Sequence, residues 1–534
     1  MKKPMAERVG FEPTIRGYRI PDFESGAFDH SATSPTARIL ACASIRRTCF
    51  SLDKARQFGE THGMTRAFIV LIFFLLLTAC GQPRKPLPPV QQSRELVVVT
   101  YNNPATYYVN GNNEFAGLEY DLVRLFERDL GPDVKIKFLV VGGVDEVIPA
   151  LLKGKAHLAA AGLDMTRLRN HLVRFGPSYQ RVQPQVVVNR EKNSGLRKVS
   201  DLAGKSLEVA AGSSDAEHLA EIAAQLPELR WSETRGAGAD ELLEKVAEGT
   251  LDATIANSQL VSMVQNYYPN LEVSFDFGLP EELAWAFPKT GEEWLYRKAQ
   301  SFFARIQKDG TLRNLLDRYY GHSERLNEMD VTNFLIRTRT VLPQYLRLFK
   351  QAQESSGVDW RLLAAISYQE SHWDTYSTSP TNVRGLMMLT EDTADRLGVT
   401  DRLDPKQSIP AGARYLLLLK DNIPSRIPEP DRTWLALAAY NIGIAHLEDA
   451  RVLAERLNLN PDAWADIKKT LPLLNKAEYY SQLKYGFARG GAPVIFVESI
   501  RTYYKILEKY EQKHTPALPK FNVALYTGKV KAIP

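Results

Sequence analysis

The stretch that decides the fold of the C-terminal half is residues 359–373, Asp-Trp-Arg-Leu-Leu-Ala-Ala-Ile-Ser-Tyr-Gln-Glu-Ser-His-Trp. Asp359 is a residue type that caps helix N-termini, so it predicts a helix that begins at the next residue. Leu363, Ile366 and Glu370 then share one face of that helix. A carboxyl group among core residues is partly removed from water, which raises its pKa and keeps it protonated near neutral pH. A general acid needs this property, although a glutamate near a helix end is more often a cap or an ion-pair partner.

The sequence around this helix lacks the alternation of strands and helices seen upstream. Leucine- and alanine-rich stretches are separated by breaks that contain glycine and proline, at 355–358, 378–385, 404–412 and 423–430. This pattern predicts an all-α domain over residues 337–513.

Further motifs follow the Glu-Ser-His-Trp stretch in a fixed order. They are Gly-Leu-Met-Met-Leu-Thr (385–390), Ala-Tyr-Asn-Ile-Gly (439–443), Gly-Gly (490–491) and Phe-Val-Glu (496–498). The ordered set resembles the soluble-lytic-transglycosylase family, which cleaves peptidoglycan and has a goose-lysozyme-like helical fold. The family commonly has glutamine after Gly-Leu-Met, and this chain has Met388 instead. That departure leaves the role of this contact open.

The resemblance implies a mechanism with one catalytic carboxyl group, Glu370. It protonates the glycosidic oxygen between N-acetylmuramic acid and N-acetylglucosamine, and the muramic N-acetyl oxygen stabilises the cationic centre. The ionised Glu370 then takes the proton of the C6 hydroxyl, which attacks to give 1,6-anhydromuramic acid. We interpret Asp374 as a solvated helix-end charge, not as a second catalytic carboxylate. The resemblance also predicts residues that contact or orient the substrate, namely Ser371, Met387, Tyr440 and Asn441, with core packing as the alternative for Met387.

Residues 94–322 alternate β-rich runs with amphipathic segments such as 118–128 and 239–248. This alternation predicts an α/β domain with a mostly parallel sheet and with ligands at the carboxyl ends of the strands. The expected strands are 95–101, 134–141, 157–162, 185–189, 206–211 and 252–256.

The local motifs of this region resemble the polar amino-acid family of bacterial solute-binding proteins, which are two-lobed. They include Gly-Leu-Glu-Tyr-Asp-Leu (117–122), Asp-Met-Thr-Arg-Leu-Arg (164–169) and Gly-Thr-Leu-Asp (249–252). The resemblance implies that Arg169 grips a ligand carboxylate through two hydrogen bonds. Asn257 stands where the family has an aspartate for the ligand ammonium group, which argues against a free amino acid. Two interpretations stay open: Arg169 binds an amino acid, peptide or muropeptide, or it makes only an internal ion pair.

The N-terminal region has the pattern of a targeting signal. Residues 64–80 combine Arg66, a short apolar run and Leu-Thr-Ala-Cys, which resembles a bacterial lipobox. We therefore expect Cys80 to be acylated and to anchor the protein to the periplasmic face of the outer membrane. Because such a signal belongs at the start of a chain, we expect residues 1–63 to be a spurious extension. The remaining segments are predicted as a proline-rich tether (81–93), a linker (323–336) and a tail (514–534).

Composition excludes several classes of protein. The net charge of +5 over 534 residues gives no reason to expect nucleic-acid binding. All three cysteines lie at or before position 80, so the folded body has no disulfide. Dinucleotide, phosphate-loop and metal-binding motifs are absent from the sequence, so we expect no cofactor and no metal. Two alternatives to a lytic transglycosylase acting on peptidoglycan strands remain: a non-enzymatic lipoprotein that binds solutes or glycan, and a hydrolytic lysozyme.

Overall fold

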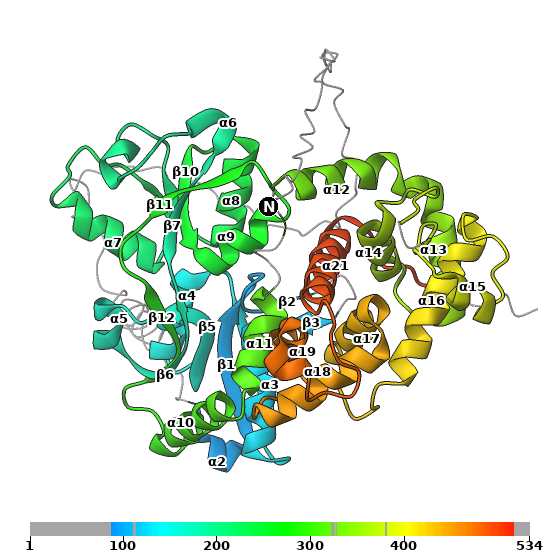
Figure 1. The fold of residues 1–534 in the computed structure, drawn as a ribbon. Helices are drawn as coiled ribbons and strands as arrows, with labels where there is room; N and C mark the ends of the chain where they lie inside the picture. The colour runs from blue at the N-terminus through cyan, green and yellow to red at the C-terminus, as the bar shows by residue number, and fades with distance from the viewer. Residues whose placement is uncertain (1–86, 110–113, 322–325, 327, 380–381, 517–534) are drawn as a thin grey trace, which may run out of the picture. The chain divides into compact units, whose positions relative to one another are not determined.

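The structure, a computed structural model, describes residues 87–109, 114–321, 326, 328–379 and 382–516 (Figure 1). These residues all belong to one compact unit, Arg84–Pro534. The predicted signal segment 64–80 with Cys80, and the stretch 1–63, lie outside the described residues. No helix of the described part is long and apolar enough to cross a membrane.

The first lobe of the solute-binding domain is built on a five-stranded sheet in the order β4-β1-β5-β12-β6. Its strands are β1 (Glu95–Tyr101), β4 (Lys135–Val141), β5 (Leu158–Asp164), β6 (Val173–Val182) and β12 (Glu281–Pro288), with the hairpin β2 (Tyr108–Val109) and β3 (Phe115–Ala116) beside them. Its helices are α2 (Val90–Ser93), α3 (Leu118–Leu130), α4 (Val144–Leu152), α5 (Arg167–Leu172), α10 (Glu293–Lys308) and α11 (Thr311–Tyr320). Alternate residues of β1 face opposite sides of the sheet and enter two hydrophobic clusters, which explains why this strand is buried on both faces.

The second lobe spans residues 184–276 and contains the sheet β10-β7-β11 and the pair β8-β9. Its elements are β7 (Pro184–Asn189), α6 (Arg190–Asn193), η1 (Val199–Leu202), β8 (Glu208–Ala210), α7 (Ser214–Ala223), β9 (Ser232–Thr234), α8 (Ala239–Glu248), β10 (Ala253–Asn257), α9 (Ser258–Gln265) and β11 (Leu271–Asp276). The chain passes between the lobes twice, from β6 to β7 and from β11 to β12. The two-lobed α/β architecture predicted from the motifs is confirmed.

The expectation of a mostly parallel sheet is wrong. The sheets are mixed and not mostly parallel, because β12 returns from the second lobe and pairs antiparallel with both β5 and β6. In the second lobe, β7 pairs antiparallel with β10 and with β11.

The expected tether 81–93 ends in the short helix α2, in which Val90 is fully buried and its amide donates to Glu292 at 2.7 Å. The last residues of that segment therefore belong to the folded domain.

The C-terminal domain is helical, as predicted. Its elements are α12 (Glu328–Thr340), α13 (Leu342–Ser356), α14 (Trp360–Ser371), α15 (Glu391–Arg396), α16 (Pro405–Asp421), α17 (Asp431–Ile442), α18 (Ile444–Arg456), α19 (Trp464–Thr470), η2 (Leu471–Asn475), α20 (Ala477–Tyr480) and α21 (Gly491–Tyr510). The central helix α14 packs against α21 and α13, and one hydrophobic cluster joins the helices (Figure 1). Ten of the twelve α14 residues are buried, which explains why apolar residues occur on nearly every face of this helix.

The expected break at 404–412 is wrong, because α16 runs through it. Asp404 caps this helix by accepting from the amide of Lys406, and Pro405 occupies a first-turn position that tolerates proline. The helix continues past Pro410 because burial of its apolar face outweighs local propensity. The expected linker 323–336 is helical from Glu328, and Phe334 is fully buried in the core of the helical domain.

A cluster of charged side chains surrounds the last helix of the solute-binding domain, α11. Asp317 on α11 pairs with Lys468 of α19, and the guanidinium of Arg501 on α21 lies 3.3 Å from the Asp317 carboxylate. Arg313 of α11 pairs with the fully buried Asp466 at 2.6 Å. Buried charges are tolerated when they are paired in this way, and each pair becomes costly when one partner is removed. These ion pairs connect α11 to helices of the C-terminal helical domain.

Candidate active site and ligand cleft

Helix α14 positions Glu370 through two local features that the sequence predicts, an N-terminal cap and an apolar face. The side chain of Asp359 accepts a hydrogen bond from the amide of Arg361 at 2.9 Å and caps the helix. Leu363 and Ile366 are fully buried on the face that leads to Glu370. The predicted cap and the predicted apolar face are both confirmed.

The carboxyl group of Glu370 is partly buried and has an uncommon environment. Burial raises its pKa from an ordinary value to about 8. Among the residues that the structure describes, none forms a hydrogen bond or an ion pair with this carboxyl group. Desolvation without a cationic partner favours the protonated form. The carboxyl group of Glu370 is therefore protonated at neutral pH, and no side chain among the described residues accepts its proton.

The backbone just after Glu370 is strained. His372 and Trp373 have φ angles of 52° and 59°, which are left-handed conformations that side-chain-bearing residues rarely adopt. Hydrogen bonds to residues of α12 and α14 hold them there. The indole of Trp373 donates to the carbonyl of Ala364 at 2.9 Å, and Arg337 donates to the carbonyl of His372 at 2.9 Å. Conformations of this kind cost about 1–3 kcal/mol each and cluster at functional sites.

A tight turn, residues 384–389, packs against the end of α14. The hydroxyls of Ser367 and Ser371 both donate to the carbonyl of Leu386, each at 3.0 Å. Gly385 in this turn has a φ angle of 80°, and a Cβ there would lie 1.9 Å from the carbonyl oxygen of Arg402. Only glycine fits both the conformation and the space. The Gly-Leu-Met motif is thus explained by backbone geometry at its first position.

Tyr440, in the last turn of α17, binds the same turn from the other side. Its hydroxyl donates to the carbonyl of Met387 at 2.9 Å, and its ring lies edge-on to Tyr415 at 4.9 Å. Burial raises the pKa of Tyr440, and the charge of Glu370 raises it further. The structure therefore brings Glu370, Ser371, Met387 and Tyr440 together.

The predicted substrate-contacting residues differ in what they present to a ligand. Ser371 is buried, and its hydroxyl lies 3.0 Å from the carbonyls of Ser367 and Leu386, either of which can accept its one proton. The side chain of Met387 is fully buried against Gly412, where a Cβ would lie 2.5 Å from the methionine methyl group. Asn441 is exposed at the end of α17. Of these three, the Asn441 side chain is the one that is open to a ligand.

Two carboxylates near the active-site motifs have other roles. Asp374 is exposed and accepts from the amide of Tyr376 at 3.0 Å, as expected for a charge just past a helix end. Glu498 is fully buried and accepts from the indole of Trp464 at 2.6 Å and from Arg501 at 2.9 Å. Glu498 is therefore a buried structural group, and it could not be assigned from the Phe-Val-Glu motif alone.

Sequence reasoning missed Ser408, a fully buried residue of α16. Its hydroxyl accepts a hydrogen bond from the amide of Met387 at 3.3 Å, so α16 also fixes the turn. Nothing in the spacing of this serine pointed to the site.

Among the described residues, no group of three His, Cys, Asp or Glu side chains could hold a metal ion.

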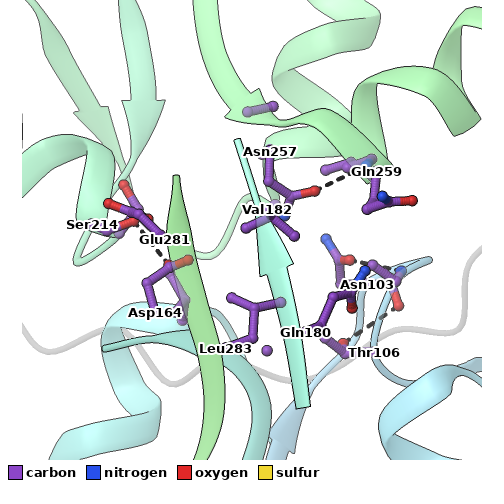
Figure 2. Close-up of a pocket in the computed structure, with 18 of the residues that line it drawn as sticks. Asn103, Thr106, Asp164, Gln180, Val182, Ser214, Asn257, Gln259, Glu281 and Leu283 are labelled. Atoms are coloured by element: carbon purple, nitrogen blue, oxygen red, sulfur yellow. Dashed lines mark hydrogen bonds between the residues drawn. The ribbon is translucent and has the colours of Figure 1, made fainter. Parts of the chain in front are cut away.

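A second site lies in the cleft between the two lobes of the solute-binding domain. Figure 2 shows Asp164, Ser214 and Glu281 gathered on one side of the cleft, and Asn257 with Gln259 on another. The side chain of Asn257 caps α9 by accepting from the amide of Leu260 at 2.9 Å. The predicted ligand residue Asn257 therefore lines the cleft, but its carbonyl oxygen already has a partner.

Arg169 of α5 is 2% exposed and does not line the cleft, and its guanidinium is paired inside the protein. It donates to Glu217 at 2.9 Å and lies 3.6 Å from the carboxylate of Asp164. Burial and neighbouring carboxylates raise the pKa of two further acids in the cleft, Asp215 and Glu281. Of the two interpretations of Arg169, the structure has the internal ion pair.

Comparisons with known proteins agree with the two-domain division. Residues 96–322 match the bacterial extracellular solute-binding proteins, family 3, and residues 347–460 match the transglycosylase SLT domain. A membrane-bound lytic murein transglycosylase F from Methylobacillus flagellatus is 60% identical over 87% of this chain and 98% of its own length. Proteins of the same name from Nitrosospira multiformis and Pseudomonas fluorescens are 49% and 44% identical. They cover 85% and 82% of this chain, and 94% and 90% of their own lengths.

Proposed function

The chain belongs to the membrane-bound lytic murein transglycosylase F family, and from this membership we propose that Glu370 is both the acid and the base of its reaction. The protein is a lytic transglycosylase that cleaves peptidoglycan. The observation that carries the proposal is the partly buried carboxyl group of Glu370, which has a raised pKa and no partner among the described residues.

The reaction starts with a proton on Glu370. This proton goes to the glycosidic oxygen between N-acetylmuramic acid and N-acetylglucosamine, and the bond to the muramic C1 breaks. The N-acetyl oxygen of the same sugar stabilises the positive charge at C1, so no second protein carboxylate is needed. Asp374 is exposed and bound to its own turn, which is consistent with a single catalytic carboxyl group.

The second half of the reaction uses the ionised form of Glu370. The carboxylate takes the proton of the muramic C6 hydroxyl, and the C6 oxygen bonds to C1 to form the 1,6-anhydro ring. Glu370 is protonated again at the end, so the cycle closes without water. Tyr440 and Ser371 hold the turn beside the carboxyl group, and Asn441 is the exposed amide that would bind the sugar.

A matched pair of amide substitutions tests this proposal. Glu370→Gln keeps the size of the side chain but removes the titratable proton, and release of soluble fragments from purified peptidoglycan should fall at least a thousandfold. Asp374→Asn changes a carboxylate four residues away and should retain most of the activity. If the two variants were equally active, or if Asp374→Asn lost all activity, the single-carboxyl proposal would be wrong.

We further propose that Cys80 is acylated and anchors the enzyme to the periplasmic face of the outer membrane. The support is the Leu-Thr-Ala-Cys sequence after an apolar run, together with the words membrane-bound in the names of the relatives. Two acyl chains give a stable anchor, whereas one gives only marginal binding. Cys80→Ser should move the protein from the membrane fraction to the soluble fraction, and an unchanged distribution would exclude the lipid anchor.

We propose that the solute-binding domain binds a carboxylate-bearing fragment of the cell wall and regulates the catalytic domain. Supporting features are the cleft between the lobes, which Asn257 lines, and the ion pairs of α11 with α19. Regulation requires a ligand that binds two states of the protein with different affinity. Titration calorimetry with a peptide-bearing wall fragment, followed by activity assays at saturation, tests both parts.

A further inference from the structure

Two donors of the first lobe converge on one carboxylate of the second lobe. The hydroxyl of Thr166 donates to one oxygen of Glu217 at 2.6 Å, and the Nε of Arg169 donates to the other at 2.9 Å. Thr166 and Arg169 lie at the start of α5, and Glu217 lies in the first turn of α7. A guanidinium and a hydroxyl that share one carboxylate form a receptor for that group.

The remaining donors of Arg169 are also used. One terminal nitrogen donates to the carbonyl of Gly212 in the second lobe at 2.9 Å, and the other donates to the carbonyl of Asp164 at 3.3 Å. The side chain of Arg169 is 2% exposed. A carboxylate from outside therefore cannot reach this guanidinium while Glu217 occupies its place.

We propose that Glu217 is a built-in occupant of the carboxylate receptor formed by Thr166 and Arg169, that it holds the two lobes together when no ligand is bound, and that a ligand carboxylate must displace it. The proposal refines the binding role proposed above for this domain and rests on that role only for the ligand. The closure of the lobes by Glu217 is a separate claim about the protein alone.

The close approach of the lobes supports this role for Glu217. At Gly212 a Cβ would lie 2.7 Å from the Cα of Asp145 in the first lobe. At Gly143 a Cβ would lie 3.2 Å from the Cα of Gly236 in the second lobe. Glycines at these points allow backbone contact across the cleft.

The space left between the lobes is small. The cavity has a volume of about 80 Å³. Arg169 is 2% exposed, so a ligand carboxylate reaches it only after the contacts that bury it break, and those of Glu217 are among them.

Other polar contacts also cross the cleft, so the contribution of Glu217 has to be measured. Ser214 donates to Asp164 at 2.8 Å, and Asn103 donates to Asp240 at 3.0 Å. These pairs involve one hydrogen bond each, whereas Glu217 accepts two and neutralises the buried Arg169. Loss of a partner of a buried charge has the larger effect on a closed state.

The distance between the lobes can be measured by double electron–electron resonance in the full chain. Spin labels are placed on the exposed positions Gln300 of α10 and Glu221 of α7, after Cys42, Cys49 and Cys80 are replaced by serine. The variants are Glu217→Ala and Glu217→Gln. Glu228→Gln is the matched control, because it changes an exposed carboxylate of the same lobe. Circular dichroism confirms that each variant is folded.

We expect one short distance without ligand in the parent protein and in the control. In Glu217→Ala most of the population should move to a longer distance, and Glu217→Gln should show a mixture. The proposal is overturned if the parent protein is already open, or if Glu217→Ala stays closed. Addition of a peptide-bearing wall fragment tests the ligand separately: failure of the fragment to bind the opened variant contradicts the proposed ligand and leaves the closure by Glu217 intact.

Discussion

The hydroxyl of Tyr440 donates a hydrogen bond of 2.9 Å to the carbonyl of Met387. The neighbouring carbonyl, that of Leu386, accepts from Ser367 and Ser371 of α14. Two successive carbonyls of one turn are thus bound from two helices, α17 and α14. This arrangement fixes the wall beside Glu370 without using the Glu370 carboxyl group itself.

Removing the Tyr440 hydroxyl should loosen this wall. We expect Tyr440→Phe to lower the free energy of unfolding by about 1 kcal/mol, the usual contribution of one hydrogen bond. The turnover number should fall about tenfold or more, because small displacements at a catalytic group are costly. Turnover on peptidoglycan and thermal unfolding measure the two effects. Tyr345→Phe, at a partly buried tyrosine of the same domain, is the control and should change turnover little.

The two serines of α14 share one acceptor, so their effects should not be additive. Ser367→Ala and Ser371→Ala should each destabilise the domain by about 1 kcal/mol. The double variant should lose more than the sum, because the buried carbonyl of Leu386 then keeps neither donor. Chemical denaturation of the four proteins measures this coupling. A strictly additive result would mean that the carbonyl finds another donor.

The pKa of Glu370 predicts the alkaline side of the pH profile. Burial raises this pKa to about 8, so the protonated acid is present at neutral pH and is lost as the pH rises above 8. The kcat/KM for a soluble glycan substrate should therefore fall tenfold per pH unit above that value. An alkaline decline that begins near pH 4.5, the ordinary value for glutamate, would show that the pKa of Glu370 is not raised.

The same pKa predicts that the active site destabilises the fold at high pH. Glu370 binds its proton more tightly in the folded state than in the unfolded state. The contribution of the Glu370 carboxyl group to the free energy of unfolding is therefore fully present below about pH 4.5, and it declines as the pH rises towards 8. Glu370→Gln should raise the thermal midpoint at pH 9 and leave it nearly unchanged at pH 4. Asp374→Asn, at an exposed position, should give no such pH-dependent gain.

Local sequence patterns predicted the elements whose contacts are local. Segment 118–128 is inside helix α3, segment 95–101 is strand β1, and Asp359 caps α14. Each depends on side-chain periodicity or on a cap within a few residues. The Asn257 cap of α9 is also local and could have been read from Asn-Ser-Gln-Leu.

Features that depend on distant residues could not be predicted in this way. Strand β12 inserts between β5 and β6 after the chain has built the whole second lobe, so its antiparallel pairing has no local signal. The pairing of Arg169 with Glu217 joins residues 48 positions apart. The hydroxyl of Ser408 meets the turn at Met387 only because α16 packs there. Tertiary packing, not propensity, decides each of these.

In the proposed reaction Glu370 takes the proton of the C6 hydroxyl, the sugar's own C6 oxygen bonds to C1, and water takes no part. This can be measured by mass spectrometry of peptidoglycan fragments that the enzyme releases in water enriched in oxygen-18. The fragments should be one water lighter than hydrolytic products and carry no heavy oxygen, and Glu370→Gln should release none. Fragments with reducing ends that contain oxygen-18 would instead show hydrolysis, and equal release by Glu370→Gln would remove Glu370 from the chemistry.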